Sequence, residues 1–209
     1  MGFMNFYSDQ VFPVINNFIS RTFSDQKEKL LKNCSGQILE IGFGSGLSLA
    51  HYPAAVSGVV GLEPNVGMRE IAKVNLTTAH PAIEVQVVAG SAEGIPFPDQ
   101  SFDGVVSIFT LCSVNDQAKA LSEIFRVLRP GGSLFFLEHT RHESGLTGWL
   151  QSTLQPVWGK AFCGCHIDRN ALQMMPLHDF EVSLQEEVGY SGFPNIVSPI
   201  YRGIATKKK

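Results

Sequence analysis

Short apolar segments that alternate with helical stretches dominate the middle of this sequence. Five such segments read as buried strands, at residues 37–41, 58–62, 83–88, 104–109 and 133–138. Helical periodicity fills the gaps between them, most clearly over residues 66–76 and 121–128. Strands that alternate with helices form a parallel sheet covered on both faces, and such strands are almost uniformly apolar. The pattern therefore predicts an α/β fold with helices on both faces of a mostly parallel sheet.

The flanking segments follow other patterns. Residues 11–22 carry apolar side chains at helical spacing, with Pro13 near the first turn, and a polar stretch extends this N-terminal helical region through residues 1–33. Residues 140–170 interrupt the alternation after the fifth strand, at the sheet edge where open α/β sheets bind ligands. We interpret residues 140–170 as a cap region on the substrate side, with an extra packing helix that does not contact substrate as the alternative. One more helix and two more strands are expected near residues 170–177, 180–187 and 200–206.

Composition narrows the class of protein and of partner. A chain of 209 residues fits a single domain, which we place over residues 1–209 with a seven-stranded sheet. The net charge of −3 offers no basic face for nucleic acid. No apolar run approaches the roughly 18 to 20 residues that span a bilayer. The four cysteines follow no disulfide framework, so we expect a soluble, cytoplasmic protein with reduced thiols. Peripheral membrane contact and the oligomeric state stay open.

A glycine-rich turn, EIGFGSG at residues 40–46, follows the first strand. Glycine lets the backbone turn sharply and lets a ligand approach closely. A nicotinamide dinucleotide site needs G-x-G-x-x-G, but the third glycine position is Leu47 in one register and Leu49 in the other. The second strand ends at Glu63, whose carboxylate can accept hydrogen bonds from both ribose hydroxyls of an adenosine. A tight turn without a ligand is the alternative for the glycines alone.

The turn E-x-G-x-G-x-G with its downstream acidic residue resembles the first motif of class I S-adenosylmethionine-dependent methyltransferases. The segments GSAEGIPF at residues 90–97 and RVLRPGG at residues 126–132 resemble the same family, so the resemblance covers residues 37–138 in the expected order. It implies a Rossmann-like sandwich that binds S-adenosyl-L-methionine and releases S-adenosyl-L-homocysteine. A nicotinamide-dependent oxidoreductase is the less favoured alternative.

The resemblance also implies which residues bind the cofactor. They belong to the glycine turn, the end of the second strand, the segment after the third strand and the end of the fourth. Many relatives carry Asp at the position of Ser91, where a hydroxyl can still hydrogen-bond to adenine. The implied residues are Glu40, Gly42, Phe43, Gly44, Gly46, Glu63, Pro64, Met68, Ser91, Ala92, Glu93, Phe109, Thr110 and Leu111. Tyr7 is a further candidate, to close over the cofactor.

Downstream motifs resemble a narrower group of small methyltransferases. LCSV at residues 111–114, LEH at 137–139 and GC at 164–165 are similar to membrane-attached thiol S-methyltransferases, and the core also resembles quinone methyltransferases. The resemblance implies a small-molecule acceptor, with a thiol or lipid-like compound favoured and a quinone-type carbon as the alternative. His139 follows the fifth strand, where the family places substrate contacts, and is the candidate catalytic base. A polar loop histidine without a role is the alternative.

Cysteine and tryptophan residues of the cap region allow further hypotheses. Cys163, Cys165 and His166 are spaced tightly and have no evident fourth ligand nearby, so we predict no metal site. Cys112 reads as a buried, space-filling side chain. The apolar residues of 149–158, including both tryptophans, could face a hydrophobic substrate or a membrane surface, with core packing as the alternative.

Overall fold

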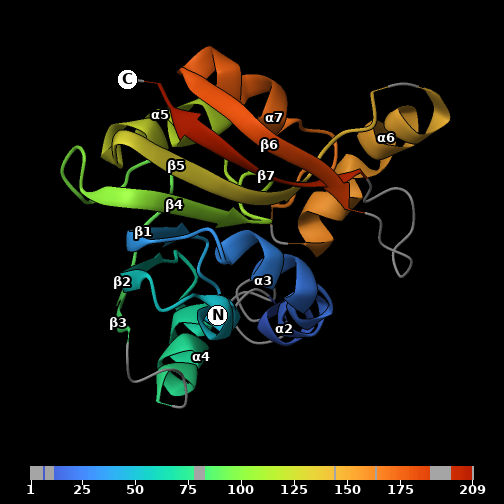
Figure 1. The fold of residues 1–209 in the computed structure, drawn as a ribbon. Helices are drawn as coiled ribbons and strands as arrows, with labels where there is room; N and C mark the ends of the chain where they lie inside the picture. Colours follow the sequence, from blue (N-terminus) through green and yellow to red (C-terminus); the bar gives the residue numbers. More distant parts are fainter. Residues whose placement is uncertain are drawn as a thin grey trace.

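The computed structural model describes residues 7, 12–77, 83–143, 145–162, 164–188 and 199–208. Within them, one sheet has the strand order β3-β2-β1-β4-β5-β7-β6 (Figure 1). The strands are β1 (Gly36–Ile41), β2 (Val56–Leu62), β3 (Glu84–Val88), β4 (Phe102–Ile108), β5 (Leu128–His139), β6 (Phe180–Val188) and β7 (Ile200–Lys207). Only β7 runs antiparallel to its neighbours. The predicted seven-stranded, mostly parallel sheet is confirmed.

Helices cover both faces of this sheet. They are α2 (Phe12–Thr22), α3 (Ser24–Leu31), α4 (Val66–Leu76), α5 (Gln117–Val127), α6 (Gly145–Ala161) and α7 (Ala171–Met174), with 3-10 turns η2 (Leu47–His51) and η3 (Met175–His178). In Figure 1, α2, α3 and α4 lie below the sheet, and α5 and α7 lie above it. None of the described helices is long and apolar enough to cross a lipid bilayer.

Alternate residues of each strand supply two separate cores. Ile38 of β1 and Val106 of β4 pack with α3 and α4, whereas Leu39 and Val105 pack with α5 and α7. Successive side chains of a strand point to opposite faces, so strands buried on both sides must be apolar throughout. This requirement explains the nearly uninterrupted apolar runs of the central strands, whereas the edge strand β3 alternates apolar and polar residues.

The observed elements differ most from the predicted ones in the N-terminal helical region and at the beginning of β5. The N-terminal helical region is two helices separated at Phe23, whose buried ring packs edge-on against Phe109 with ring centroids 4.8 Å apart. The strand β5 begins at Leu128 instead of Ser133, because Leu128 pairs with Phe102 across a register shift. Both differences come from contacts between residues that are distant in the sequence.

Candidate cofactor and acceptor site

A cavity of about 690 Å³ lies at the carboxyl ends of β1, β2 and β4. The strand order reverses between β1 and β4, and open α/β sheets bind ligands at such a reversal. The volume lies within the roughly 300–1,000 Å³ of small-molecule sites. His139 and the residues that the resemblance assigned to cofactor binding all line it, except Gly46 and Leu111. These two residues do not line the cavity: Gly46 lies immediately before η2, and Leu111 is fully buried in the core.

Two loops form the floor of this cavity and pack directly on each other. Gly42, which follows β1, has a φ of 62°, in the left-handed region that favours glycine. A Cβ atom at Gly42 would lie 2.1 Å from Oγ1 of Thr110, which follows β4. The Thr110 hydroxyl donates a 3.1 Å hydrogen bond to the Ile41 carbonyl. The close approach of the two loops therefore requires glycine at position 42.

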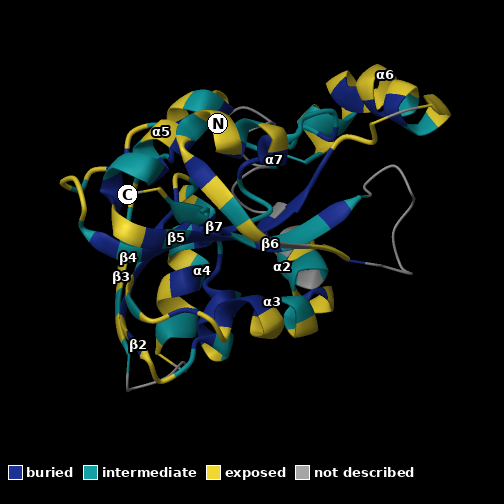
Figure 2. Cartoon of the chain, turned by 45° about the horizontal axis from the view of Figure 1, so that its top comes forward, coloured by how far each residue is buried: buried dark blue, intermediate teal, exposed yellow. Residues whose placement is uncertain are grey.

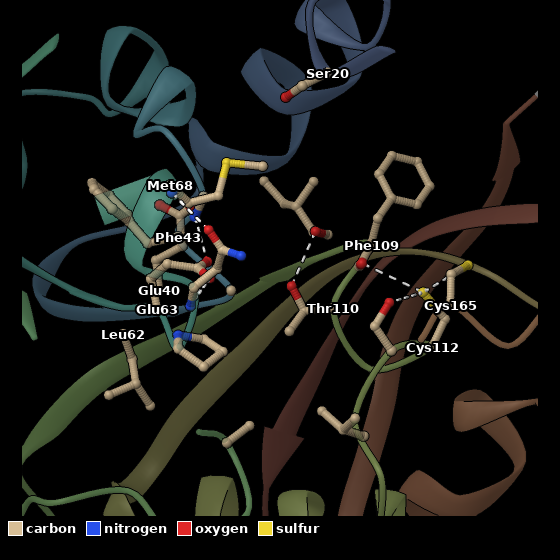
Figure 3. Close-up of a pocket in the computed structure, with 18 of the residues that line it drawn as sticks. Ser20, Glu40, Phe43, Leu62, Glu63, Met68, Phe109, Thr110, Cys112 and Cys165 are labelled. Carbon is tan, nitrogen blue, oxygen red and sulfur yellow. Dashed lines mark hydrogen bonds between the residues drawn. The ribbon is translucent and has the colours of Figure 1, made fainter. Parts of the chain in front are cut away.

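Glu63 follows β2 and points into the cavity (Figure 3). Its two carboxylate oxygens accept 2.8 Å hydrogen bonds from the backbone N–H groups of Gly44 and Asn65. Burial raises the pKa of this carboxyl. Each carboxylate oxygen can accept more than one hydrogen bond, so both can still receive a hydroxyl from the cavity side. The arrangement suits a pair of adjacent hydroxyl groups such as those of a ribose.

The segment after β3 is tied to the beginning of α5. Oε1 of Glu93 accepts a 2.6 Å hydrogen bond from the Asn115 N–H and a longer one, 3.4 Å, from the Asp116 N–H. Ser91 accepts a 3.4 Å hydrogen bond from the Glu93 N–H, and both side chains line the cavity. The carboxylate of Glu93 therefore holds this loop in place as well as facing the cavity.

Two buried ionisable residues, Glu40 and Lys27, line the N-terminal side of the cavity. Glu40 accepts hydrogen bonds from the Ser48 hydroxyl (2.7 Å) and the Tyr52 hydroxyl (2.8 Å). Burial raises the pKa of Glu40 to about 7, and it lowers the pKa of Lys27, which donates to Ser20. Sequence reasoning missed Lys27, because it lies in a polar stretch typical of a solvated helix.

The opposite end of the cavity holds two thiols and an imidazole. Nε2 of His139 lies 2.9 Å from Sγ of Cys165, which lies 3.8 Å from Sγ of Cys112. Trp158 and Phe162 of the cap region stack beside them with ring centroids 4.2 Å apart, and all five residues line the cavity. Sequence reasoning placed His139 here, but it missed Cys165 as a cavity residue and treated Cys112 as filling.

Hydrogen bonding and charge make this end of the cavity electrostatically unusual. The contact with Cys112 and the neighbouring imidazole lower the pKa of Cys165 to about 4. Burial alone would lower the pKa of His139, but the Cys165 thiolate raises it. Nδ1 of His139 is buried and has no hydrogen-bond partner among the described residues. The contact between these two side chains therefore favours the thiolate form of Cys165 and the protonated form of His139.

Other sequence-level candidates lie elsewhere. The Tyr7 hydroxyl donates a 2.6 Å hydrogen bond to the Ala161 carbonyl at the end of α6 and does not line the cavity. Cys163 lies outside the described residues. Trp149 is 61% exposed on α6, a helix that presents many exposed residues in Figure 2. The two tryptophans thus have different surroundings, Trp149 in solvent and Trp158 on the cavity.

Comparison with known proteins agrees with this geometry. Residues 39–136 match a family model described as a methyltransferase domain. The human thiol S-methyltransferase TMT1A is 31% identical to this chain over 172 residues, which are 81% of this chain and 70% of the human protein. The chain belongs to the class I S-adenosylmethionine-dependent methyltransferases. The part that matches the family model ends before His139, so it includes the glycine turn and Glu63 and excludes the cap region.

This methyltransferase has further relatives. The ubiquinone/menaquinone biosynthesis C-methyltransferase UbiE of Marinomonas sp. is 29% identical, over 76% of this chain and 66% of that protein. A Haemonchus contortus phosphoethanolamine N-methyltransferase 2, solved with S-adenosyl-L-methionine, has the same fold: its TM-score is 0.72 at 15% identity, over 100% of this chain and 60% of the other. These matches leave open which small molecule this methyltransferase modifies.

Proposed function

We propose that this methyltransferase transfers the methyl group of S-adenosyl-L-methionine to the sulfur of a small thiol. The observation that carries the proposal is one continuous cavity with two chemically different ends. One end carries the carboxylate of Glu63 and the glycine turn. The other end carries aromatic rings beside Cys112, His139 and Cys165. The first end suits the cofactor, and the second suits an apolar, polarisable acceptor.

The residues at the first end fit the parts of the cofactor. Glu63 would hold the ribose hydroxyls, and the segment 91–93 would face the adenine. Glu40 and Lys27 also line this end, where their ionised side chains would be opposite in charge to the cofactor's ammonium and carboxylate groups. The glycine turn leaves room for the methionine part. The sulfonium of the cofactor supplies an already activated methyl group.

The protein's contribution to the reaction is to bind, orient and exclude water. The acceptor thiol must first lose its proton to water. Its thiolate then forms a bond to the methyl carbon while the bond from that carbon to the sulfonium breaks. The electron pair of the broken bond stays on the cofactor sulfur, which yields S-adenosyl-L-homocysteine and a thioether. Opposite charges cancel in this step, so the dry wall of Trp158 and Phe162 favours it. Correct positioning can supply roughly 7–11 kcal/mol.

His139 is the residue that we propose to contact the acceptor. It is 5% exposed and lies at the carboxyl end of β5, on the cavity wall. The thiol S-methyltransferase activity named for the human relative supports a sulfur acceptor. Quinone methyltransferases are also among the relatives, so a phenol-like ring is the alternative acceptor to test beside a thiol.

Two measurements test the proposal. Calorimetric titration with S-adenosyl-L-homocysteine should give saturable, micromolar binding, and a parallel titration with NAD should give none. The enzyme is then incubated with S-adenosyl-L-methionine and small aromatic thiols, demethylquinones or lipids, and methylated products are identified by mass spectrometry. A thioether product supports the proposal. Methylation of the quinone or the lipid alone would contradict the thiol acceptor. Absence of binding of S-adenosyl-L-homocysteine would contradict the assignment of the cofactor.

A further inference from the structure

Three potential metal ligands converge at the acceptor end of the cavity from three separate segments. Cys112 lies in the loop after β4, His139 ends β5, and Cys165 lies in the loop after α6. One ligand atom from each residue lies within 4.8 Å of those of the other two. Thiolate and imidazole are the ligands that zinc prefers in proteins. Figure 3 shows the two sulfur atoms directed toward each other beside the cavity.

The distances suit a tetrahedral ion. Two thiolates about 2.3 Å from a tetrahedral zinc lie about 3.8 Å apart, and the two sulfur atoms here are 3.8 Å apart. The contact between the His139 imidazole and Cys165, 2.9 Å, would open by about 0.6 Å around such an ion. Two thiolates and a neutral imidazole also cancel the charge of a divalent cation, so the buried group would carry no net charge.

Hydrogen bonds fix the loops that present these ligands. Oε1 of the fully buried Glu138 accepts from the backbone N–H groups of Thr110 (2.9 Å) and Leu111 (3.0 Å), immediately before Cys112. Gln155 of α6 donates to the Cys165 carbonyl (3.2 Å) and accepts from the Ile167 N–H (2.9 Å). The surroundings thus hold the ligands in place, as outer contacts do in metal sites.

A direct backbone contact joins two of the three segments. The N–H group next to Cys165, that of His166, donates a 2.9 Å hydrogen bond to the Cys112 carbonyl. The two loops therefore cannot separate without losing this bond, and their sulfur atoms remain neighbours. Ligands held in advance on several elements are what a preformed metal site requires.

We propose that Cys112, His139 and Cys165 bind one zinc ion whose fourth coordination position faces the cavity. Three protein ligands and one open position are the arrangement of catalytic zinc sites, in which the open position takes water or substrate. All three ligands line the cavity, so an acceptor can reach the ion from it. An acceptor thiol would bind there as its thiolate, with its proton released to water. That use of the ion rests on the proposed thiol methylation, whereas the zinc site itself does not.

The proposal differs from the sequence-level expectation of no metal. The pattern considered there, Cys163 with Cys165 and His166, joins neighbours in the sequence. In the structure Nδ1 of His166 contacts Gln155 (2.9 Å) instead of the cavity. The ligands proposed here come together only through the sheet and the cap, and a sequence search for closely spaced ligands does not find them.

Metal binding is measured on the full chain, stripped with a chelator and kept reduced with a phosphine, because thiol reductants compete for zinc. Zinc is titrated by calorimetry, and Co²⁺ is titrated by absorption spectroscopy. We expect one zinc per chain and, with Co²⁺, sulfur-to-metal charge-transfer bands together with intense tetrahedral bands. Absence of stoichiometric binding by the folded protein, or Co²⁺ spectra without sulfur bands, would overturn the proposal.

Substitutions locate the site. Cys112→Ser, His139→Ala and Cys165→Ser should each weaken zinc binding at least 100-fold, whereas Cys34→Ser and His166→Asn should leave it unchanged. Cys165→Asp keeps a possible ligand, so it should still bind Co²⁺ with weaker sulfur bands. Circular dichroism and binding of S-adenosyl-L-homocysteine show that each variant is folded. Unchanged zinc affinity in a folded Cys165→Ser variant would contradict the assignment.

The two proposals can fail separately. If the protein methylates thiols equally well with and without zinc and binds no ion, only the zinc site fails. If zinc binds with the expected spectrum but no thiol is methylated, the site stands and the thiol acceptor fails. Both results come from the same purified protein, so neither failure can be mistaken for the other.

Discussion

Glu63 connects two loops at the edge of the cavity. Its carboxylate joins the glycine turn after β1 to the beginning of α4, through backbone hydrogen bonds from Gly44 and Asn65. It also faces the cavity where we place the ribose. The position of this acidic residue directly after a strand predicted that it faces the cavity. The prediction was possible because the strand and the carboxylate follow one another in the sequence.

Replacing Glu63 by Gln should weaken binding of S-adenosyl-L-homocysteine about 10–100-fold. The amide presents a donor to at least one of the two N–H groups that the carboxylate accepts from, and hydrogen bonds to a charged group contribute roughly 1.5–3 kcal/mol each. Calorimetric titration measures the loss. Glu70→Gln, at an exposed position of α4, is the matched control and should bind normally. Equal affinity in the two variants would contradict the placement of the ribose.

The buried Glu40 should make the stability of the protein depend on pH. Burial raises its pKa to about 7, whereas a glutamate in the unfolded chain titrates at roughly pH 4.3. Between these values the folded protein retains a proton that the unfolded chain has lost. The free energy of unfolding should therefore fall as pH rises through this window, by about 1–3 kcal/mol from this residue.

Glu40→Gln cannot titrate and should remove this part of the pH dependence. Urea unfolding at about pH 5 and about pH 7.5 measures it in both proteins. The wild type should lose stability between the two pH values, and the variant should lose less. Glu70→Gln is again the control and should keep the wild-type difference. An equal loss in wild type and Glu40→Gln would show that Glu40 titrates normally in the folded state.

At the scale of elements, the strand-to-turn junctions are the least tolerant parts of the fold. Gly42→Ala places a Cβ within 2.1 Å of the Thr110 side chain and also forces an alanine to a φ of 62°. The left-handed conformation costs roughly 1–2 kcal/mol, and overpacking adds about 1–3 kcal/mol. Urea unfolding should therefore show a total loss of about 2–5 kcal/mol, together with weaker cofactor binding.

Gly131 provides the control for this substitution. Its φ is 79°, but a Cβ there would meet no atom within 4 Å. Gly131→Ala should therefore lose only the conformational part, about 1–2 kcal/mol, and should bind S-adenosyl-L-homocysteine normally. If the two variants were equally stable, contact between the loops would not be what requires glycine at position 42.

Local patterns predicted the elements well and the contacts between distant elements poorly. The strands were visible because burial on both faces demands apolar runs. The separation of α2 from α3 at Phe23 was not, because it depends on a ring contact with Phe109. The same holds for the site. The glycine turn and Glu63 lie close in sequence. Cys165 becomes a candidate site residue only through its contacts with Cys112 and His139, which are distant from it in the sequence.

At the scale of the molecule, the cavity is walled by the N-terminal helices, the sheet edge and the cap region. Ser20 and Lys27 come from the N-terminal helices, Glu63 and Ser91 from the sheet edge, and Trp158 from the cap region. A ligand in this cavity contacts all of these parts at once. Cofactor binding should therefore stabilise the whole fold and not one half of it.

Binding of S-adenosyl-L-homocysteine should raise the thermal midpoint in a single transition. At a concentration 100 times its Kd, a ligand that binds only the folded state contributes about 2.7 kcal/mol. For a chain of this size that corresponds to roughly 5–11 °C. Scanning calorimetry with and without the ligand measures the shift, with NAD as the control. Two separate transitions, of which only one moves, would show that the cavity does not link the parts of the chain.

The position of β7 has a consequence for how the protein is made. The strand β6 pairs within the sheet only with β7, which follows it in the chain and inserts between β5 and β6. On the ribosome, β6 therefore emerges before its partner exists, and β5 remains an open edge meanwhile. The sheet can close only after β7 has emerged, so chaperones that shield exposed strand edges would act on this protein until then.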